Sequence, residues 1–572
     1  MPENKTIRWL YSVPGKKKLY IATLTAVQAL NGASGVLYAL LLREVVDAAS
    51  AHVADGFRRY VIFLLALVCA QLAIRAVIRW LTELSKSTFE NIFKKRLMDT
   101  LLHSDYLRVS AVHSAEWINR LTNDTRVVAD DYVEILPGLC GMVVKLISAL
   151  VMIIAMEPGF AAVIIPVGIL LVIFSWLFRK VLKRLHKGIQ ESDGRLRIFL
   201  QERIGSMLMI RSFAAEDRTG EDAAARMEEH KTARMRRNRF SNICNIGFGA
   251  AMSGMYLLGV CWCGYGILTG TMTFGTLTAI TQLISQIQSP FANITGYLPR
   301  FYAMTASAER LMEAESFDKD ENEAKTPEEI DGFYRNMFSG IGLDGVSFRY
   351  LPVTDSAADM DKESLPPALE DLNLDIGNGE YVAFTGPSGC GKSTALKLLM
   401  CVYEPDSGER YYTDRKGNRY PLTSEYRRLF AYVPQGNVLM NGTIRDVVSF
   451  PQPEASHDDE RLETALRIAC ADGFVSELED GVETMLGERG SGLSEGQMQR
   501  LAIARAVFSG SPVLLLDEAT GSLDADTESA VLRNLREMTD RTVVIVTHRT
   551  AAMDACDRVL EFTESGVIRH DR

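Results

Sequence analysis

A glycine-rich segment in the C-terminal half has the residue types and spacing of a phosphate-binding loop. It matches G-x-x-x-x-G-K-[ST] between the apolar run Tyr381–Thr385 and a helical run that starts at Ala395. The loop consists of Gly386, Pro387, Ser388, Gly389, Cys390, Gly391, Lys392, Ser393 and Thr394. Its glycines let backbone N–H groups face phosphate oxygens, and the following helix N-terminus adds positive potential. We expect Lys392 to bridge the β- and γ-phosphates of a nucleotide and Ser393 to bind Mg²⁺. The alternative is a glycine-rich turn followed by a chance lysine.

Two adjacent carboxylates end the apolar run Val513–Leu516. At the tip of a buried strand, Asp517 can hold Mg²⁺ through water, and Glu518 can polarise an attacking water as a general base. Paired acids are common on protein surfaces, so a purely solvated pair is the alternative. The phosphate loop upstream favours the catalytic interpretation.

Several shorter segments around these motifs resemble ATP-binding cassette (ABC) proteins, and their order and spacing match over about 230 residues. Leu493-Ser494-Glu495-Gly496-Gln497 resembles the signature segment of that family. The others are Gln435 (glutamine loop), His548 (switch histidine), Ser522-Leu-Asp524 (the loop after the second nucleotide motif) and Tyr350 (the aromatic that stacks on adenine). Arg500 and Arg505, which follow the signature, could simply form a solvated helix face.

The resemblance implies a role for each of these residues. The implied catalytic residues are Glu518, His548 and Gln435, and the implied metal site comprises Ser393, Gln435 and Asp517. The implied ATP contacts are the phosphate loop, Tyr350, Asp524 and, towards the nucleotide of a second subunit, Ser494, Gly496 and Gln497. Such a protein therefore needs a second half-transporter, as a homodimer or a heterodimer.

Two features depart from the family pattern. Glu495 stands where the signature has glycine, and a carboxylate pointing at a polyphosphate would weaken binding, so we expect it to point outwards. The stretch Leu351–Pro367 lengthens the connection after Tyr350 and is expected to be a surface loop. The segment Thr484–Gly490 resembles an exporter-specific segment that touches the inner loops.

The N-terminal half holds six apolar stretches of the length that crosses a bilayer, about 20 residues. They are Leu19–Leu42, Tyr60–Leu81, Val133–Met156, Phe160–Val181, Ile243–Leu268 and Phe274–Leu298. The loops between spans two and three and between four and five are long and basic. Positive residues stay on the cytoplasmic side, which predicts that both termini and both long loops are cytoplasmic.

Helical periodicity continues through both long loops. We therefore expect helices that project beyond the bilayer and reverse near Tyr106–His113 and near Ser206–Phe213. A charged, loose stretch then separates this part from alternating strand-like and helical runs that indicate an α/β domain.

Polar residues inside the expected spans are candidates for contacting a transported molecule. They are Gln28, Asn31, Arg75, Lys145, Gln282, Gln286, Gln288 and Asn293. Hydrogen bonds between helices are the alternative for the amides, and snorkelling for Arg75. If these side chains face a cavity, the ligand has polar groups and some negative charge.

Overall composition excludes one class of protein and argues against another. The apolar stretches exclude a purely soluble chain, and a formal net charge of −10 argues against a nucleic-acid binder. The nine cysteines show no metal-binding spacing and are expected to be buried free thiols.

These observations predict a six-helix all-α transmembrane domain (1–303), a linker (304–340) and an α/β P-loop ATPase domain (341–572). The resemblance to exporter-type ABC half-transporters covers nearly the whole chain. It implies ATP-driven export of an amphipathic small molecule, peptide or lipid, with ATP and Mg²⁺ as cofactors, in what is expected to be a bacterial plasma membrane. An exporter-fold importer, a lipid flippase and a membrane ATPase that regulates a partner are the alternatives.

Overall fold

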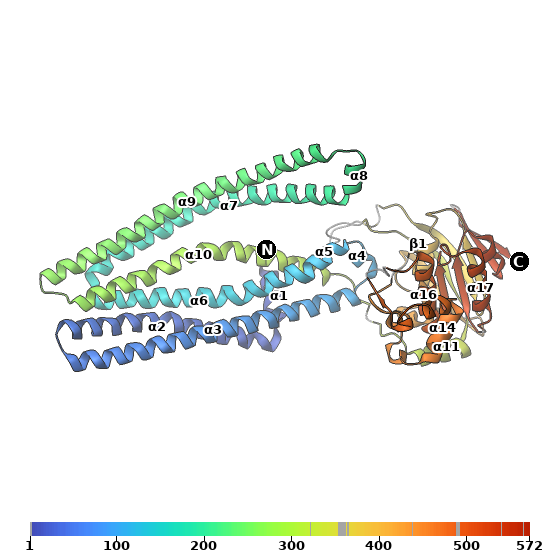
Figure 1. The fold of residues 1–572 in the computed structure, drawn as a ribbon, viewed down its shortest axis with the longest axis horizontal. Helices are drawn as coiled ribbons and strands as arrows, with labels where there is room; N and C mark the ends of the chain where they lie inside the picture. The colour runs from blue at the N-terminus through green and yellow to red at the C-terminus, as the bar shows by residue number, and fades with distance from the viewer. Residues whose placement is uncertain are drawn as a thin grey trace. The chain divides into compact units, whose positions relative to one another are not determined.

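The computed structural model describes residues 3–320, 322–352, 362, 365–436, 439–487, 492–538, 540–563 and 566–571 (Figure 1). These residues form two compact units. The helical unit comprises Met1–Lys94 and Thr122–Glu309, and the sheet unit comprises Lys95–Leu121 and Arg310–Arg572.

The helical unit is built from long helices joined by short connections. Its helices are α1 (Glu3–Ser12), α2 (Lys18–Ser50), α3 (Ala54–His103), α6 (Thr125–Met156), α7 (Pro158–Gly205), α8 (Met207–Ser212), α9 (Glu216–Leu268) and α10 (Phe274–Ala314), and α3 and α10 continue into the sheet unit. Helices α7 and α9 run side by side and are joined through α8 (Figure 1). The reversal at α8 lies in the second segment where the sequence predicted one.

Four stretches of the described chain are long and apolar enough to cross a membrane. They are Gly15–Ser50, Ala54–His103, Ser114–Met156 and Glu216–Leu268, and they contain the first, second, third and fifth expected spans. The fourth expected span begins in a shorter apolar stretch of α7, Pro158–Leu170. The sixth lies on α10, whose glutamine, threonine and serine residues lower its hydropathy.

Close contact between α2 and α6 organises the helical unit. A Cβ at Gly32 of α2 would lie 2.6 Å from the carbonyl oxygen of Gly141 on α6, so only glycine allows the two backbones this approach. An apolar core lies along α2, α6, α7, α9 and α10 and includes Ile153, Phe160 and Ile284.

The sheet unit contains two larger sheets and a two-stranded ladder. An antiparallel sheet has the order β2 (Leu369–Gly377), β1 (Phe338–Phe348), β4 (Ser407–Asp414) and β5 (Arg419–Pro421). The main sheet has the order β12 (Gly566–Asp571), β11 (Arg558–Thr563), β3 (Tyr381–Thr385), β10 (Thr542–Val546), β9 (Val513–Asp517) and β6 (Phe430–Val433). Only β12 of the main sheet is antiparallel to its neighbour. The short pair is β7 (Gly442–Thr443) and β8 (Met485–Leu486).

Helices connect these strands and cover their faces. They are α11 (Pro327–Asn336), α12 (Lys392–Leu399), α13 (Ile444–Ser449), α14 (Asp459–Ile468), α15 (Asp472–Ser476), α16 (Glu495–Phe508), α17 (Ala525–Arg536) and α18 (Thr550–Asp554). The apolar runs Tyr381–Thr385 and Val513–Leu516 lie in β3 and β9, and β10 lies between these two strands at the centre of the main sheet. An α/β fold is therefore confirmed for this part of the chain.

The sheet unit also includes the first predicted reversal. There α4 (Tyr106–Ser110), α5 (Ser114–Asn119) and a π-helical turn (Arg120–Asp124) connect α3 to α6. The buried guanidinium of Arg120 at this turn pairs with Glu116 (3.1 Å) and Glu313 (3.0 Å).

All nine cysteines are free, as expected, but not all are buried. Cys69 on α3 and Cys261 on α9 are exposed in the isolated chain, because both lie on helix faces turned away from the core. Cys263 is fully buried, so Cys261 and Cys263 do point to different sides of α9.

Candidate active site

The phosphate loop lies between β3 and α12, in the strand–loop–helix context that the motif requires. A Cβ at Gly386, where φ is +128°, would lie 2.2 Å from the carbonyl oxygen of Phe562, so the position requires glycine. Gly391 precedes α12 in a left-handed conformation. The buried Lys392 Nζ donates to the carbonyl oxygens of Gly386 (2.7 Å) and Pro387 (2.8 Å), which holds the ammonium group against the loop.

A buried carboxylate lies next to the phosphate loop at the end of β9. Asp517 is 1% exposed and accepts hydrogen bonds from Ser393 Oγ (2.9 Å) and Tyr432 OH (2.9 Å). Burial raises the pKa of Asp517, and these two hydrogen bonds oppose that rise. Burial and the neighbouring Asp517 charge raise the pKa of Tyr432. The structure thus brings together Ser393 and Asp517, two of the three expected metal ligands.

The three expected catalytic residues meet around the carboxylate of Glu518. Gln435 Nε2 donates to one carboxylate oxygen at 2.6 Å, and His548 Nε2 lies 3.7 Å from the other. They come from the carboxyl ends of β6, β9 and β10, which are neighbours in the main sheet. Glu518 has φ +50°, a conformation that costs a non-glycine residue energy, and its N–H donates to Val546 O at 3.1 Å. This geometry fits a general base held in a set orientation.

The signature segment forms the N-terminus of α16. Ser494 is the N-cap and forms a capping box with Gln497: Gln497 N donates to Ser494 Oγ (3.3 Å), and Ser494 N donates to Gln497 Oε1 (2.8 Å). A Cβ at Gly496 would lie 3.1 Å from Ser522 O. Glu495 is exposed on the first turn. In the described part of this chain, Ser494 and Gln497 hydrogen-bond each other and not the phosphate loop.

The two remaining expected ATP contacts have partners within the chain. Asp524 is the N-cap of α17 and accepts from Thr527 N at 3.0 Å, which lowers its pKa. Tyr350 OH shares a hydrogen bond with Thr394 Oγ1 of the phosphate loop at 2.9 Å, and burial raises the pKa of Tyr350. The tyrosine therefore lies beside the phosphate loop. Residues 488–491 and most of 353–364 lie outside the described residues. They comprise the last three residues of the exporter-like segment and most of the long loop after Tyr350.

Some supporting residues were not found from the sequence. Tyr432 holds Asp517, and the only signal was its position on a strand three residues before Gln435. Gln499 Oε1 accepts from Ser522 N at 3.0 Å, and Arg549 Nη1 donates to the buried Glu528 at 2.9 Å. These contacts hold the loops that follow β9 and β10, and no local pattern marks them.

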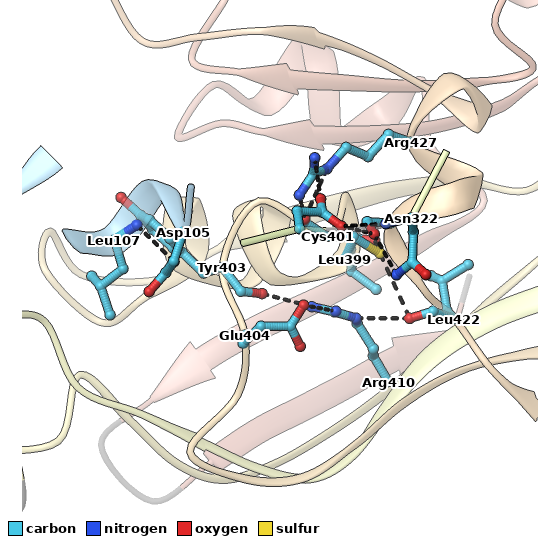
Figure 2. Close-up of polar contacts among 12 residues, drawn as sticks. Asp105, Leu107, Asn322, Leu399, Cys401, Tyr403, Glu404, Arg410, Leu422 and Arg427 are labelled. Carbon is cyan, nitrogen blue, oxygen red and sulfur yellow. Dashed lines mark hydrogen bonds and ion pairs between the residues drawn. The ribbon is translucent and has the colours of Figure 1, made fainter. Parts of the chain in front are cut away.

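A loop after α12 connects the nucleotide site to α4. Tyr106 of α4 stacks on Tyr403, with ring centroids 5.9 Å apart. Arg410 donates to Tyr403 O at 2.6 Å, and Arg427 donates twice to Cys401 O, at 2.6 and 2.9 Å (Figure 2). Cys401 itself has φ +58°. The two guanidinium groups thus hold this loop in a strained conformation that presents Tyr403 to α4.

Most polar candidates of the expected membrane spans gather at one cavity of the helical unit. Its lining includes Gln28, Asn31, Arg75, Lys145, Gln282 and Gln286. Gln288 instead connects two helices: its Nε2 on α10 donates a hydrogen bond to Met252 O on α9 at 3.0 Å. Asn293 falls among the residues whose side chains are outside the description.

Fold and site together define an ATPase of the ABC class joined to membrane helices, and comparison with known families agrees. Residues 20–291 match the ABC transporter transmembrane region, and residues 369–521 match the ABC transporter family. The chain belongs to the ABC transporters: it is an integral multi-pass membrane protein with the fused membrane and ATP-binding regions of an exporter. ABC transporters couple ATP hydrolysis to transport.

Individual relatives cover different shares of the chain. The chain is 26% identical to an ATP-dependent lipid A-core flippase of Mannheimia succiniciproducens over 97% of this chain and 92% of the relative. It is 32% identical to the corresponding flippase of Aliivibrio fischeri over 52% of this chain and only 48% of the relative, so that match spans about half of the relative's length. A fatty acid ABC transporter ATP-binding/permease protein of Mycobacterium bovis is 29% identical over 78% of this chain and 67% of the relative.

A solved structure shares the whole fold. A bacterial Atm1-family ABC exporter with ATP bound superposes with a TM-score of 0.77 at 21% identity, over 96% of this chain and 94% of that one. The helical membrane region followed by an α/β ATPase is therefore confirmed.

Proposed function

We propose that this chain is half of an ATP-driven exporter whose ATP hydrolysis depends on Glu518. The observation that carries the proposal is the meeting of Gln435, Glu518 and His548 beside the phosphate loop, in a chain that also holds the membrane helices. Glu518 accepts the proton of the attacking water, His548 stabilises the charge that develops, and Gln435 holds the Glu518 carboxylate. Lys392 leaves its loop carbonyls to bind the β- and γ-phosphates of ATP.

The residues beside the phosphate loop fit a magnesium ion. Ser393 offers a hydroxyl oxygen and Asp517 a carboxylate oxygen 2.9 Å from it, and hard oxygen donors are what Mg²⁺ prefers. Ser393 and Asp517 would hold the ion, Asp517 through water, with Gln435 nearby on the Glu518 side. When bound, Mg²⁺ neutralises phosphate charge. Tyr432 keeps the Asp517 carboxylate oriented towards Ser393.

We propose further that two copies, or this chain and a related one, assemble around two ATP molecules. Ser494, Gly496 and Gln497 then complete the site of the other subunit. Exposed apolar residues on α8 and directly after it support the pairing, since Leu208 is 85% and Phe213 77% exposed in the isolated chain. We place α8 on the ATPase region of the partner. The basic long loops support a cytoplasmic position for both termini and for the ATPase region, in a bacterial plasma membrane.

Relatives support an amphipathic cargo, because those named above are a lipid A-core flippase and a fatty acid transporter. Import by the same fold and regulation of another membrane protein are the competing functions. ATP-dependent flux of labelled lipids, peptides or drugs into inside-out vesicles separates them, since a regulator produces no flux and an importer moves cargo the other way.

The first experiment compares Glu518→Gln with the unmodified chain in proteoliposomes. We expect the variant to bind ATP with little change and to lose hydrolysis by roughly 10²–10⁴-fold, as removal of a general base does. Glu537→Gln, an exposed glutamate just after α17, is the matched control and keeps full activity. Rapid turnover by Glu518→Gln would refute the assigned role.

A further inference from the structure

A cavity of about 610 Å³ lies within the helical unit, and its wall is unusually cationic. It is lined from α2, α3, α6 and α10, and the described lining includes Arg75 and Lys145 but no aspartate or glutamate. The two cations come from two different helices, Arg75 from α3 and Lys145 from α6. A positive charge inside a membrane span is costly, and a bound anion would lower that cost.

Arg75 differs from the cations that lie near one end of α6. Arg300 pairs with Asp131 (2.6 Å) and Glu134 (2.7 Å), and Lys86 also pairs with Glu134. Arg75, by contrast, forms no hydrogen bond or ion pair with any residue that the structure describes. The described residues thus supply carboxylates for the cations near one end of α6 and none for Arg75.

Two of the neighbouring amides, Gln286 and Gln71, connect the helices of the cavity wall. Gln286 Nε2 donates to Gly35 O at 2.6 Å, tying α10 to α2. Gln71 Nε2 donates to Ser34 O and Ser34 Oγ, both at 3.2 Å, tying α3 to α2. These contacts hold α10 and α3, which carries Arg75, against α2 before any ligand arrives.

We propose that this cavity binds the carboxylate or phosphate headgroup of an amphipathic cargo, and that Arg75 and Lys145 select for its negative charge. The inference rests on the proposed transport function and names the class of molecule transported. A volume of about 610 Å³ is within the usual range of small-molecule sites, so it accepts a headgroup with part of its chain and not a folded protein. Tyr38, Val68 and Met142 in the same wall supply apolar surface for that chain.

The test uses four probes with the same dodecyl chain on the full-length protein in phosphatidylcholine nanodiscs. The probes are dodecanoate, dodecyl phosphate, dodecanamide and dodecyltrimethylammonium, and the readout is equilibrium binding. We expect both anions to bind at least tenfold more tightly than the amide or the ammonium. Arg75→Gln and Lys145→Gln should each remove most of that preference, and Arg75→Lys should retain it.

Arg79→Gln is the matched control, because Arg79 lies on the same helix, is exposed and does not line the described cavity. It should leave the preference intact. A general effect of lost positive charge, such as weaker recruitment of anions to the bilayer surface, would lower binding equally in Arg79→Gln and would overturn the inference. Because Arg75→Gln could fail to fold, its thermal unfolding is compared with that of Arg75→Lys, and Lys145→Gln supplies the second measurement.

Two further outcomes decide the proposal. Equal binding of amide and carboxylate to a chain that still hydrolyses ATP would overturn the charge preference alone, whereas absence of hydrolysis in the unmodified chain would count against the proposed function. Displacement of dodecanoate by an equal concentration of inorganic phosphate would mean that a free anion, not an amphipath, is recognised. Failure of inorganic phosphate to compete supports the headgroup assignment.

Discussion

The ring of Tyr106 lies at 24° to the ring of Tyr403, and Tyr403 in turn meets Tyr350 edge-on, with 5.7 Å between the centroids and 90° between the planes. Phe348 stacks on Tyr403 at 5.1 Å and completes the cluster. The first turn of α4 is thereby linked, through Tyr403, to Tyr350, the residue that the sequence resemblance implies stacks on adenine. A packed cluster of this kind can transmit a change at the nucleotide to α4 only if it has two arrangements, which mutation can test.

We predict that Tyr106→Ala separates hydrolysis from transport. The substitution removes a stacking contact of about 0.5–1.5 kcal/mol without touching the phosphate loop. Basal ATP hydrolysis in proteoliposomes should stay within about twofold, while ATP-dependent cargo flux falls at least fivefold. Tyr106→Phe keeps the ring and should keep the flux. Parallel loss of both activities in Tyr106→Ala would argue for a folding role instead.

We predict that His548→Ala lowers kcat for ATP hydrolysis roughly a hundredfold, at the lower end of what acid–base groups contribute. KM for ATP should change little, because His548 contacts Glu518 and not the phosphate loop. His457→Ala, at an exposed histidine before α14, serves as the control. A large rise in KM with unchanged kcat would show that His548 acts in binding ATP.

Because Asp517 is buried, we predict that Asp517→Asn has opposite effects on Tm in the absence and in the presence of nucleotide. Folding raises the pKa of Asp517 above its value in the unfolded chain. The ionised carboxylate is therefore less favourable in the folded state than in the unfolded state, so this group lowers the free energy of unfolding as the pH rises between the two pKa values. Asp517→Asn should therefore raise Tm by a few degrees at pH 7 without nucleotide, and the difference should shrink towards pH ~4.

Addition of ATP and Mg²⁺ should reverse this order, since the unmodified chain gains stability from binding and Asp517→Asn gains much less. Differential scanning fluorimetry across pH measures both effects. Asp480→Asn, at an exposed aspartate, should follow the unmodified chain in every condition. A lower Tm for Asp517→Asn at pH 7 without nucleotide would contradict the expected sign.

Contact between α2 and α6 predicts a difference between two glycines. Gly32→Ala places a methyl group 2.6 Å from Gly141 O and should cost about 1–3 kcal/mol through overpacking. Gly168→Ala has open space around its Cβ and should be neutral or gain up to about 1 kcal/mol from helix propensity. Thermal unfolding in detergent compares them, and equal Tm values would show that α2 and α6 can separate freely.

The chemistry of the nucleotide site could be predicted from sequence because its motifs are local. In the phosphate loop, the glycines, Lys392 and Ser393 are contiguous, and strand β3 before it is marked by five apolar or small residues. Apolar length likewise predicted the membrane helices. Glu518 was identified in the same way, by its place one residue after a buried strand.

Tertiary structure alone decided which distant residues meet. Gln435 and His548 reach Glu518 because β6, β9 and β10 are adjacent in the sheet. No single segment of the sequence determines that strand order. Arg75 and Lys145 share a cavity with Gln282, while Gln288 packs against α9, because the rotation of each helix about its axis depends on its neighbours. Sequence determined the chemical groups available and the elements that carry them, whereas packing determined which of those groups face one another.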